Sequence, residues 1–173
     1  MAATGTAAIA AAAEAMVTAF GAGHKVLVFG NGGSAADAQH FVAELVVRYE
    51  RERPPRAAIA LTTDTSVLTA MANDIDFSQV FVRQLEALGK PGDVAFAITT
   101  SGRSPNVVKA LERANALELK TIVVTGGDGG DAGRLAQIHV NVPSPRTATA
   151  QEVHITVLHI LCELIDNALT TED

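Results

Sequence analysis

Residues 25–35 read KVLVFGNGGSA, an apolar run that ends in a glycine-rich turn. The run Lys25–Phe29 is short and almost continuously apolar, which is typical of a strand covered on both faces in a parallel sheet. Helical periodicity starts at Ala35, directly after the turn, and continues to about Arg48. A buried strand, a glycine turn and a helix in this order predict the beginning of a βαβ unit.

The same alternation continues along the chain. Four further apolar runs are predicted to be strands: Ala57–Leu61, Val94–Ile98, Thr121–Val124 and Ile138–Val142. Helices are predicted in an alanine-rich N-terminal segment (residues 1–22, clearest at about Thr6–Phe20), at Ser66–Met71, at Asn106–Glu118, in a short turn near Ala132–Ala136, and at residues 148–169. We therefore expect an α/β fold, a doubly wound and mainly parallel sheet of five strands flanked by helices.

The composition excludes several classes of protein. The length of 173 residues suits a single domain, residues 1–173. A net charge of −6 with six Phe, one Tyr and no Trp argues against a nucleic-acid binder. The single cysteine, Cys162, allows neither an internal disulfide nor a thiolate zinc cluster. No stretch approaches the roughly 20 apolar residues of a membrane span, and no Lys or Arg precedes Lys25, as a secretory signal would require. We therefore expect a cytoplasmic domain that binds neither nucleic acid nor membrane.

The turn Gly30–Ala35 is the first candidate for ligand binding. Its glycines let a ligand approach the backbone, and the helix that follows offers free N–H groups to an anion. The turn also fits the dinucleotide pattern G-x-G-x-x-A. The acidic residue that should bind the ribose is missing, however, because Glu50 and Glu52 precede the second strand and Asp64 follows it at the wrong spacing. A nucleotide-binding Rossmann domain therefore fails as an interpretation, and a simple tight turn remains as the alternative to a ligand-binding loop.

The loop Thr99–Ser104 carries a stronger signal for phosphate. Thr99, Thr100, Ser101 and Ser104 place four hydroxyls within six positions, between an apolar strand and the helix near Asn106. Hydroxyls and helix-end amides together suit a phosphate monoester, whereas a helix cap requires only one such residue. Arg103 either adds positive charge there or points to solvent.

Two pairs of polar residues have the spacing of a shared face on a helix. His40 and Glu44 are four residues apart, so they could bind one metal ion, act as an acid–base pair, or form an ordinary solvated pair. Gln151 and His159 are eight residues apart, roughly 12 Å along a helix axis, which is near the limit for sharing one ion. His and Glu together with Gln form a plausible nitrogen and oxygen set for Zn²⁺.

The remaining candidates have simpler interpretations. His24 and His139 are expected to be structural or exposed, His154 lies on a different helix face from His159, and Cys162 is expected to be a small core residue. Asn73-Asp74 and Thr125–Asp131 are typical of turns. The charged run Arg48–Arg56 (RYERERPPR) is expected to be a solvated connection, with a substrate or subunit contact as the alternative.

These motifs, taken in order, resemble those of the bacterial phosphoheptose isomerases, which are sugar-isomerase (SIS) domain proteins with a flavodoxin-like sheet. The matching segments are Phe29–Phe41 with Glu44, Ala72–Asp74, Thr99–Gly102 with Ser104–Asn106, and Gln151–His154 with His159. The chain departs from the pattern at Arg103, where relatives often have Asn, and in Arg146–Ala150, where they have an acidic and a basic residue.

The resemblance implies a role for each matching residue. Asn31, Gly32, Gly33, Asn73 and Asp74 would contact the sugar, and Thr99, Thr100, Ser101 and Ser104 would hold its phosphate. One Zn²⁺ per subunit would be bound by His40, Glu44, Gln151 and His159, with Glu44 and Gln151 also touching the substrate. The family assembles as a homotetramer with active sites at subunit boundaries.

The expected reaction converts the ketose sedoheptulose 7-phosphate into the aldose D-glycero-D-manno-heptose 7-phosphate. Such an isomerisation moves a proton between C1 and C2, with a base at carbon and an acid or metal at oxygen. We assign Glu44 as the base and His159 as the acid, with zinc assistance. The alternative is a non-catalytic SIS-domain adaptor that binds a replication initiator or senses a phosphosugar, and the presence of His40, Glu44, Gln151 and His159 favours the enzyme.

Overall fold

The computed structural model describes residues 2–169 and their side chains from residue 5 onward. Its five strands are β1 (Val26–Gly30), β2 (Ala58–Ala60), β3 (Val94–Thr99), β4 (Lys120–Gly126) and β5 (Ile138–Val142). They form one sheet in the order β2-β1-β3-β4-β5, and every neighbouring pair is parallel. The expected α/β sheet with a flavodoxin-like strand order is therefore confirmed, and it is wholly rather than mainly parallel.

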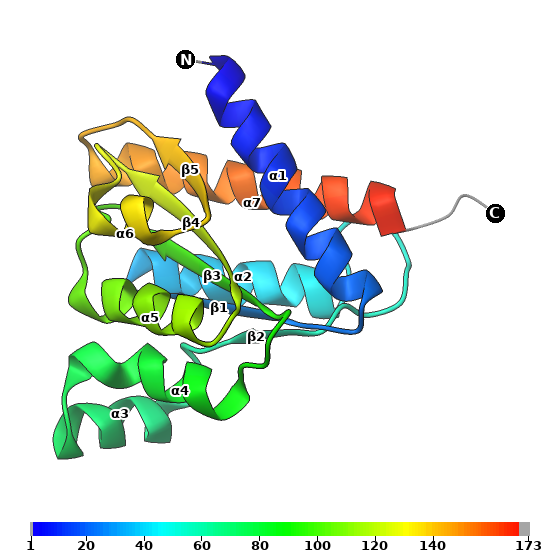
Figure 1. Ribbon diagram of the computed structural model, residues 1–173. Coiled ribbons are helices and arrows are strands. Elements are labelled where there is room, and N and C mark those ends of the chain that lie inside the picture. The colour runs from blue at the N-terminus through cyan, green and yellow to red at the C-terminus, as the bar shows by residue number, and fades with distance from the viewer. Residues whose placement is uncertain (1, 170–173) are drawn as a thin grey trace.

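Helices cover both faces of this sheet (Figure 1). They are α1 (Ala2–Gly21), α2 (Gly33–Val46), α3 (Thr65–Asp74), α4 (Val80–Leu88), α5 (Pro105–Ala116), α6 (Gly130–Leu135) and α7 (Thr147–Leu169), with a 3₁₀ turn, η1, at Phe77–Gln79. Within the described residues, no helix is long and apolar enough to cross a membrane.

The core is divided into two layers by the alternation of side chains along the strands. On one face, Val26, Val28 and Phe96 pack with α1, α2 and α7. On the other face, Leu27 and Phe29 pack with residues of α4 and α5. Because both faces are covered, the strands have the continuous apolar runs seen in the sequence.

The strand order reverses between β1 and β3, since the chain moves outward from β1 to β2 and then returns to the other side. In open parallel sheets, ligands bind outside the carboxyl ends of the strands at such a reversal. Gly30, at the end of β1, is in register with Ile98 of β3. The glycine turn and the hydroxyl-rich loop therefore leave the sheet side by side.

Two elements differ from the sequence prediction. The helix α4 and the turn η1 were not predicted, although Val80, Phe81 and Leu85 of α4 are buried. No side chain caps the start of α4, so it lacks the usual sequence signal of a helix N-terminus. Asn73 and Asp74 were predicted to form a turn, which is wrong, because they are the last two residues of α3.

Candidate functional site

The glycine turn leads directly into α2. Gly32 is the residue before the helix and has a positive φ of 57°, and no side chain caps this end. No capping side chain occupies the first amides of the helix, although those of Ser34 and Ala35 donate to the carbonyl oxygens of Asn31 and Gly32 (3.0 Å each). A helix N-terminus without a capping side chain favours anion binding.

The hydroxyl-rich loop has a similar arrangement at the start of α5. Ser104 occupies the capping position, but its side chain makes no cap hydrogen bond, and Pro105 follows as the first helical residue. The Thr99 hydroxyl accepts a hydrogen bond from the amide of Gly102 (3.3 Å), and the Ser101 hydroxyl accepts one from the amide of Arg103 (3.2 Å). Because the Ser104 hydroxyl makes no capping hydrogen bond, the structure favours a phosphate-binding role for it over a capping role.

Gly102 fixes this loop against a second one. It has a φ of +64°, and a Cβ atom at this position would lie 2.0 Å from the carbonyl oxygen of Gly129. Arg103, whose direction the sequence left open, forms a bidentate ion pair with Asp128 across the two loops, at 2.8 and 2.6 Å. The hydrogen bonds from Arg103 lower the pKa of the exposed Asp128 carboxyl to about 2. The positive charge of Arg103 is therefore already paired.

Asn106 joins the glycine turn to the hydroxyl-rich loop, a role that was not assigned to it from the sequence. Its side-chain amide and that of Asn31 each donate to the carbonyl oxygen of the other, at 2.8 and 2.9 Å. Asn106 is buried, with 3% of its surface exposed. The spacing between the starts of α2 and α5 is thereby fixed by a pair of neutral amides 75 residues apart in the sequence.

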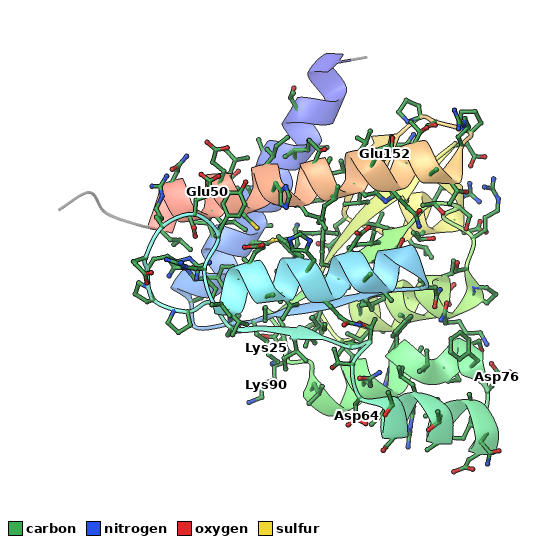
Figure 2. All side chains as sticks on the ribbon, turned by 180° about the vertical axis from the view of Figure 1, so that it is seen from behind. Lys25, Glu50, Asp64, Asp76, Lys90 and Glu152 are labelled. Carbon is green, nitrogen blue, oxygen red and sulfur yellow. The ribbon has the colours of Figure 1, made fainter. Side chains whose placement is uncertain are left out.

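The second part of the site lies between α2 and α7, which pack side by side (Figure 2). Near the start of α2, a Cβ atom at Gly33 would lie 2.2 Å from Nε2 of Gln151. Further along, His40 Nε2 lies 2.9 Å from Oε1 of Glu44, and the rings of His40 and His159 meet edge to face at 5.3 Å. The structure thus brings His40, Glu44 and His159 together and places Gln151 beside the glycine turn.

The donors at this interface match zinc in their chemistry. Two imidazoles and one carboxylate are ligands that Zn²⁺ commonly takes. Within residues 2–169, however, no three His, Cys, Asp or Glu side chains form a group that could hold a metal by themselves. Gln151 contacts Gly33, which is seven residues, or roughly 10 Å of helix, before His40. The zinc set of the sequence prediction therefore remains a prediction.

Two further polar residues lie in this interface and were not assigned to the site. His154 is fully buried, and neither ring nitrogen has a hydrogen-bond partner in the structure; Oδ2 of Asp37 is also buried without one. Burial lowers the pKa of His154, and the backbone of Thr125 and then the Asp37 carboxylate partly offset this shift. Burial raises the pKa of Asp37, and His154 partly offsets that shift. Helical spacing did not indicate that His154 belongs to this interface, because His154 was expected on a different face of its helix from His159.

Asn73 and Asp74 lie apart from the residues described above. Both are exposed at the end of α3, where Asn73 donates a hydrogen bond to the Asp74 carboxylate (2.8 Å). This helix packs chiefly against η1 and α4. Their predicted contact with the sugar is therefore not formed within this part of the site.

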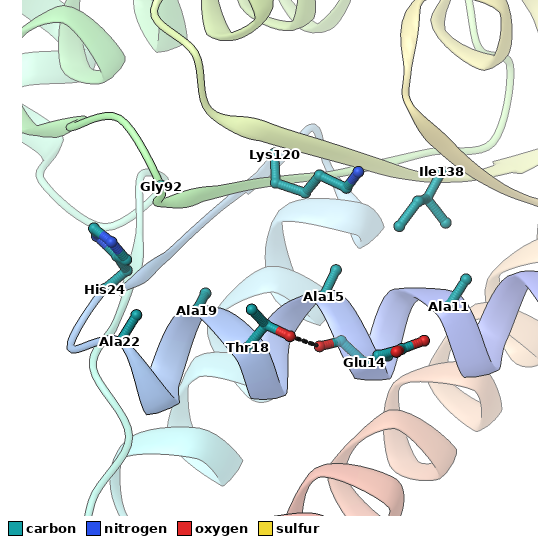
Figure 3. A pocket seen from close by; sticks show the side chains of 10 residues that line it. All are labelled: Ala11, Glu14, Ala15, Thr18, Ala19, Ala22, His24, Gly92, Lys120 and Ile138. Atoms are coloured by element: carbon teal, nitrogen blue, oxygen red, sulfur yellow. Dashed lines mark hydrogen bonds between the residues drawn. The ribbon is translucent and has the colours of Figure 1, made fainter.

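A separate hollow lies beside α1, at the end of the sheet where the strands begin (Figure 3). It has a volume of about 660 Å³, and residues of α1, among them Ala11, Ala15 and Ala19, face Lys120 and Ile138 across it. None of the predicted site residues lines it. The candidate site is at the opposite end of the strands.

Comparisons with known proteins agree with this architecture. A model of the SIS domain matches residues 1–126. The phosphoheptose isomerase of Aromatoleum aromaticum is 58% identical over 91% of this chain and 81% of its own length. The corresponding protein of Methylibium petroleiphilum is 54% identical over 95% of this chain and 84% of its own length.

Solved structures show the same relationship. A phosphoheptose isomerase from Francisella tularensis superposes with a TM-score of 0.89 at 47% identity, covering 92% of this chain and 85% of the other. One from Neisseria gonorrhoeae gives 0.88 at 45% identity with the same coverage. Fold and relatives together define the class of protein, which is an isomerase of sugar phosphates. The chain belongs to the SIS domain family and, within it, to the phosphoheptose isomerases.

Proposed function

We propose that this protein interconverts sedoheptulose 7-phosphate and D-glycero-D-manno-heptose 7-phosphate by moving a proton between C1 and C2. The observation that carries the proposal is the meeting of His40, Glu44 and His159 between α2 and α7. This cluster supplies a carboxylate and two imidazoles, which are the usual groups for proton transfer at carbon and oxygen.

Each part of the site has a task in this proposal. Thr99, Thr100, Ser101 and Ser104 bind the phosphate at the start of α5, and Asn31, Gly32 and Gly33 contact the sugar. Glu44 removes the carbon-bound proton, and His159 supplies a proton to the oxygen. His40, Glu44, Gln151 and His159 would hold one Zn²⁺, which when bound would polarise the carbonyl group of the sugar.

The proposal extends to the assembly and its location. Ile75 and Phe77 expose 62% and 54% of their surface beside Asn73 and Asp74. Large exposed apolar side chains of this kind favour contact with another chain. We infer that a second subunit covers them within a homotetramer, so that Asn73 and Asp74 contact sugar at a subunit boundary. The protein would act in the cytoplasm.

The test is incubation with sedoheptulose 7-phosphate while NMR follows formation of the aldose. We expect turnover that a chelator abolishes and added Zn²⁺ restores. Glu44→Gln should abolish turnover but leave binding of inorganic phosphate unchanged, because the phosphate loop lies elsewhere. Glu112→Gln, at an exposed position on α5, is the matched control and should remain active. Absence of conversion with metal supplied would refute the proposed activity, and activity in Glu44→Gln would refute the assignment of the base.

A further inference from the structure

Arg53 belongs to the charged segment Arg48–Arg56 but does not behave as a solvated residue. Only 1% of its side chain is exposed. Its guanidinium donates to the carbonyl oxygens of Glu44 (2.6 Å) and Leu45 (2.7 Å) and to Oδ1 of Asp166 (2.8 Å). The expectation of a solvated connection is therefore wrong at this position.

These three contacts join the two helices that carry the proposed acid–base groups. Glu44 and Leu45 form the last turn of α2, whose carbonyl groups have no partner within the helix. Asp166 lies on α7, seven residues or two helical turns beyond His159, and so on the same face. Arg53 thus links the backbone of Glu44 to the helix that presents His159.

We propose that Arg53 is a positioning residue for the isomerisation, because it sets the place of Glu44 relative to His159. This inference rests on the proposed function. None of these hydrogen bonds of Arg53 reaches the carboxylate of Glu44 or the ring of His159. It acts through the α2 backbone.

The choice of arginine supports a geometric role over a role in stability alone. A buried ion pair seldom stabilises a fold more than well-packed apolar residues of the same volume would. The planar guanidinium, however, provides several donors in a fixed fork, which the single ammonium of lysine cannot reproduce. Here the fork is used on two consecutive carbonyls and a carboxylate at the same time.

The first experiment compares Arg53→Met and Arg53→Lys with Arg51→Met. Arg51 is a matched control, because it lies in the same segment and also bonds α7, through Oδ1 of Asn167 (2.8 Å), but is exposed. Rates are taken per folded molecule, well below each variant's Tm. We expect kcat to fall on the order of 10- to 100-fold in Arg53→Met, as for a displacement of about 1 Å. The KM should change less than about twofold, Arg53→Lys should be intermediate, and Arg51→Met should match the unmodified protein.

A second measurement separates this inference from the proposed function. Histidine ring ¹H–¹⁵N spectra report the surroundings of His40 and His159 whether or not the protein turns over the sugar. Both signals should shift in Arg53→Lys and in Asp166→Asn, while that of His24 stays in place. If the unmodified protein is inactive but the rings shift, the proposed function fails while the structural coupling of Arg53 to His40 and His159 stands. Unchanged rings, or a kcat in a folded Arg53 variant within twofold of normal, would overturn the inference.

Discussion

Replacing Gly33 with alanine should displace the side chain of Gln151 without lowering the stability of the fold. A Cβ atom at Gly33 would lie 2.2 Å from Nε2 and 2.9 Å from Cδ of Gln151. Ordinary contact begins at 3.4 Å, so the end of the glutamine must move by at least about 1.2 Å. The atoms in the way are the end of a flexible side chain, so the displacement strains the backbone little.

The two effects of the substitution have opposite signs. Gly33 starts α2, where alanine favours the helix by roughly 0.5–1 kcal/mol over glycine. A displacement of about 1 Å in a reacting site costs up to about 100-fold in rate, which corresponds to about 2.7 kcal/mol of activation free energy. We therefore expect Gly33→Ala to unfold at the same or a higher temperature while kcat/KM falls by about two orders of magnitude.

The assay is isomerisation followed by NMR, alongside thermal unfolding followed by circular dichroism. Gly21→Ala is the control, because Gly21 also lies in a helix but has nothing within 4 Å of its Cβ position. If Gly33 acts through Gln151, the double variant Gly33→Ala/Gln151→Ala should be no slower than Gln151→Ala alone. Full activity in Gly33→Ala, or additive losses in the double variant, would refute the reasoning.

Two further predictions concern ionisable groups. The hydrogen bonds from Arg103 lower the pKa of Asp128 from 3.8 to about 2. The contribution of this pair to the stability of the fold is therefore fully present above pH 3.8 and is lost as the pH falls through about 2. Arg103→Asn should return the Asp128 pKa toward 3.8 in a carboxyl NMR titration, and an unchanged value would contradict the pairing. Burial lowers the pKa of His154 below 6.5, so the unfolded chain takes up the proton first and stability falls as the pH drops below about 6.5, by up to about 1.4 kcal/mol per pH unit. In His154→Leu, the free energy of unfolding measured with denaturant between pH 7 and 5 should lack this part of its pH dependence. An identical pH dependence in the variant and the unmodified protein would count against the prediction.

The sheet was predictable because its strands are short, apolar and followed by turn residues. The run Val94–Ile98 differs from the observed β3 by a single residue, and Ile138–Val142 coincides with β5. The helix α4 was not predicted, since its N-terminus has no capping side chain and follows a 3₁₀ turn directly, although Phe81 and Leu85 have the i, i+4 spacing of a buried helix face. Its place is determined by packing, because Phe81 contacts Phe29 of β1 with ring centroids at 5.2 Å.

The residues of the candidate site likewise differ in whether local sequence could predict them. The loop Thr99–Ser104 and the pair His40–Glu44 depend on local spacing, so the sequence shows them. Asn106 and Arg53 depend on partners that are distant in the sequence, Asn31 and Asp166. Nothing in the neighbourhood of either residue indicates which group it will meet once the sheet is assembled.

The paired amides of Asn31 and Asn106 also bear on how the protein ages. Asn31 is followed by Gly32, and asparagine before glycine is chemically prone to lose ammonia and become aspartate. That change would replace the donor facing Asn106 with a second acceptor and set a carboxylate beside the hydroxyl-rich loop. Hydrolysis of one amide would thus disrupt the link between the starts of α2 and α5 and leave the hydrophobic core unchanged.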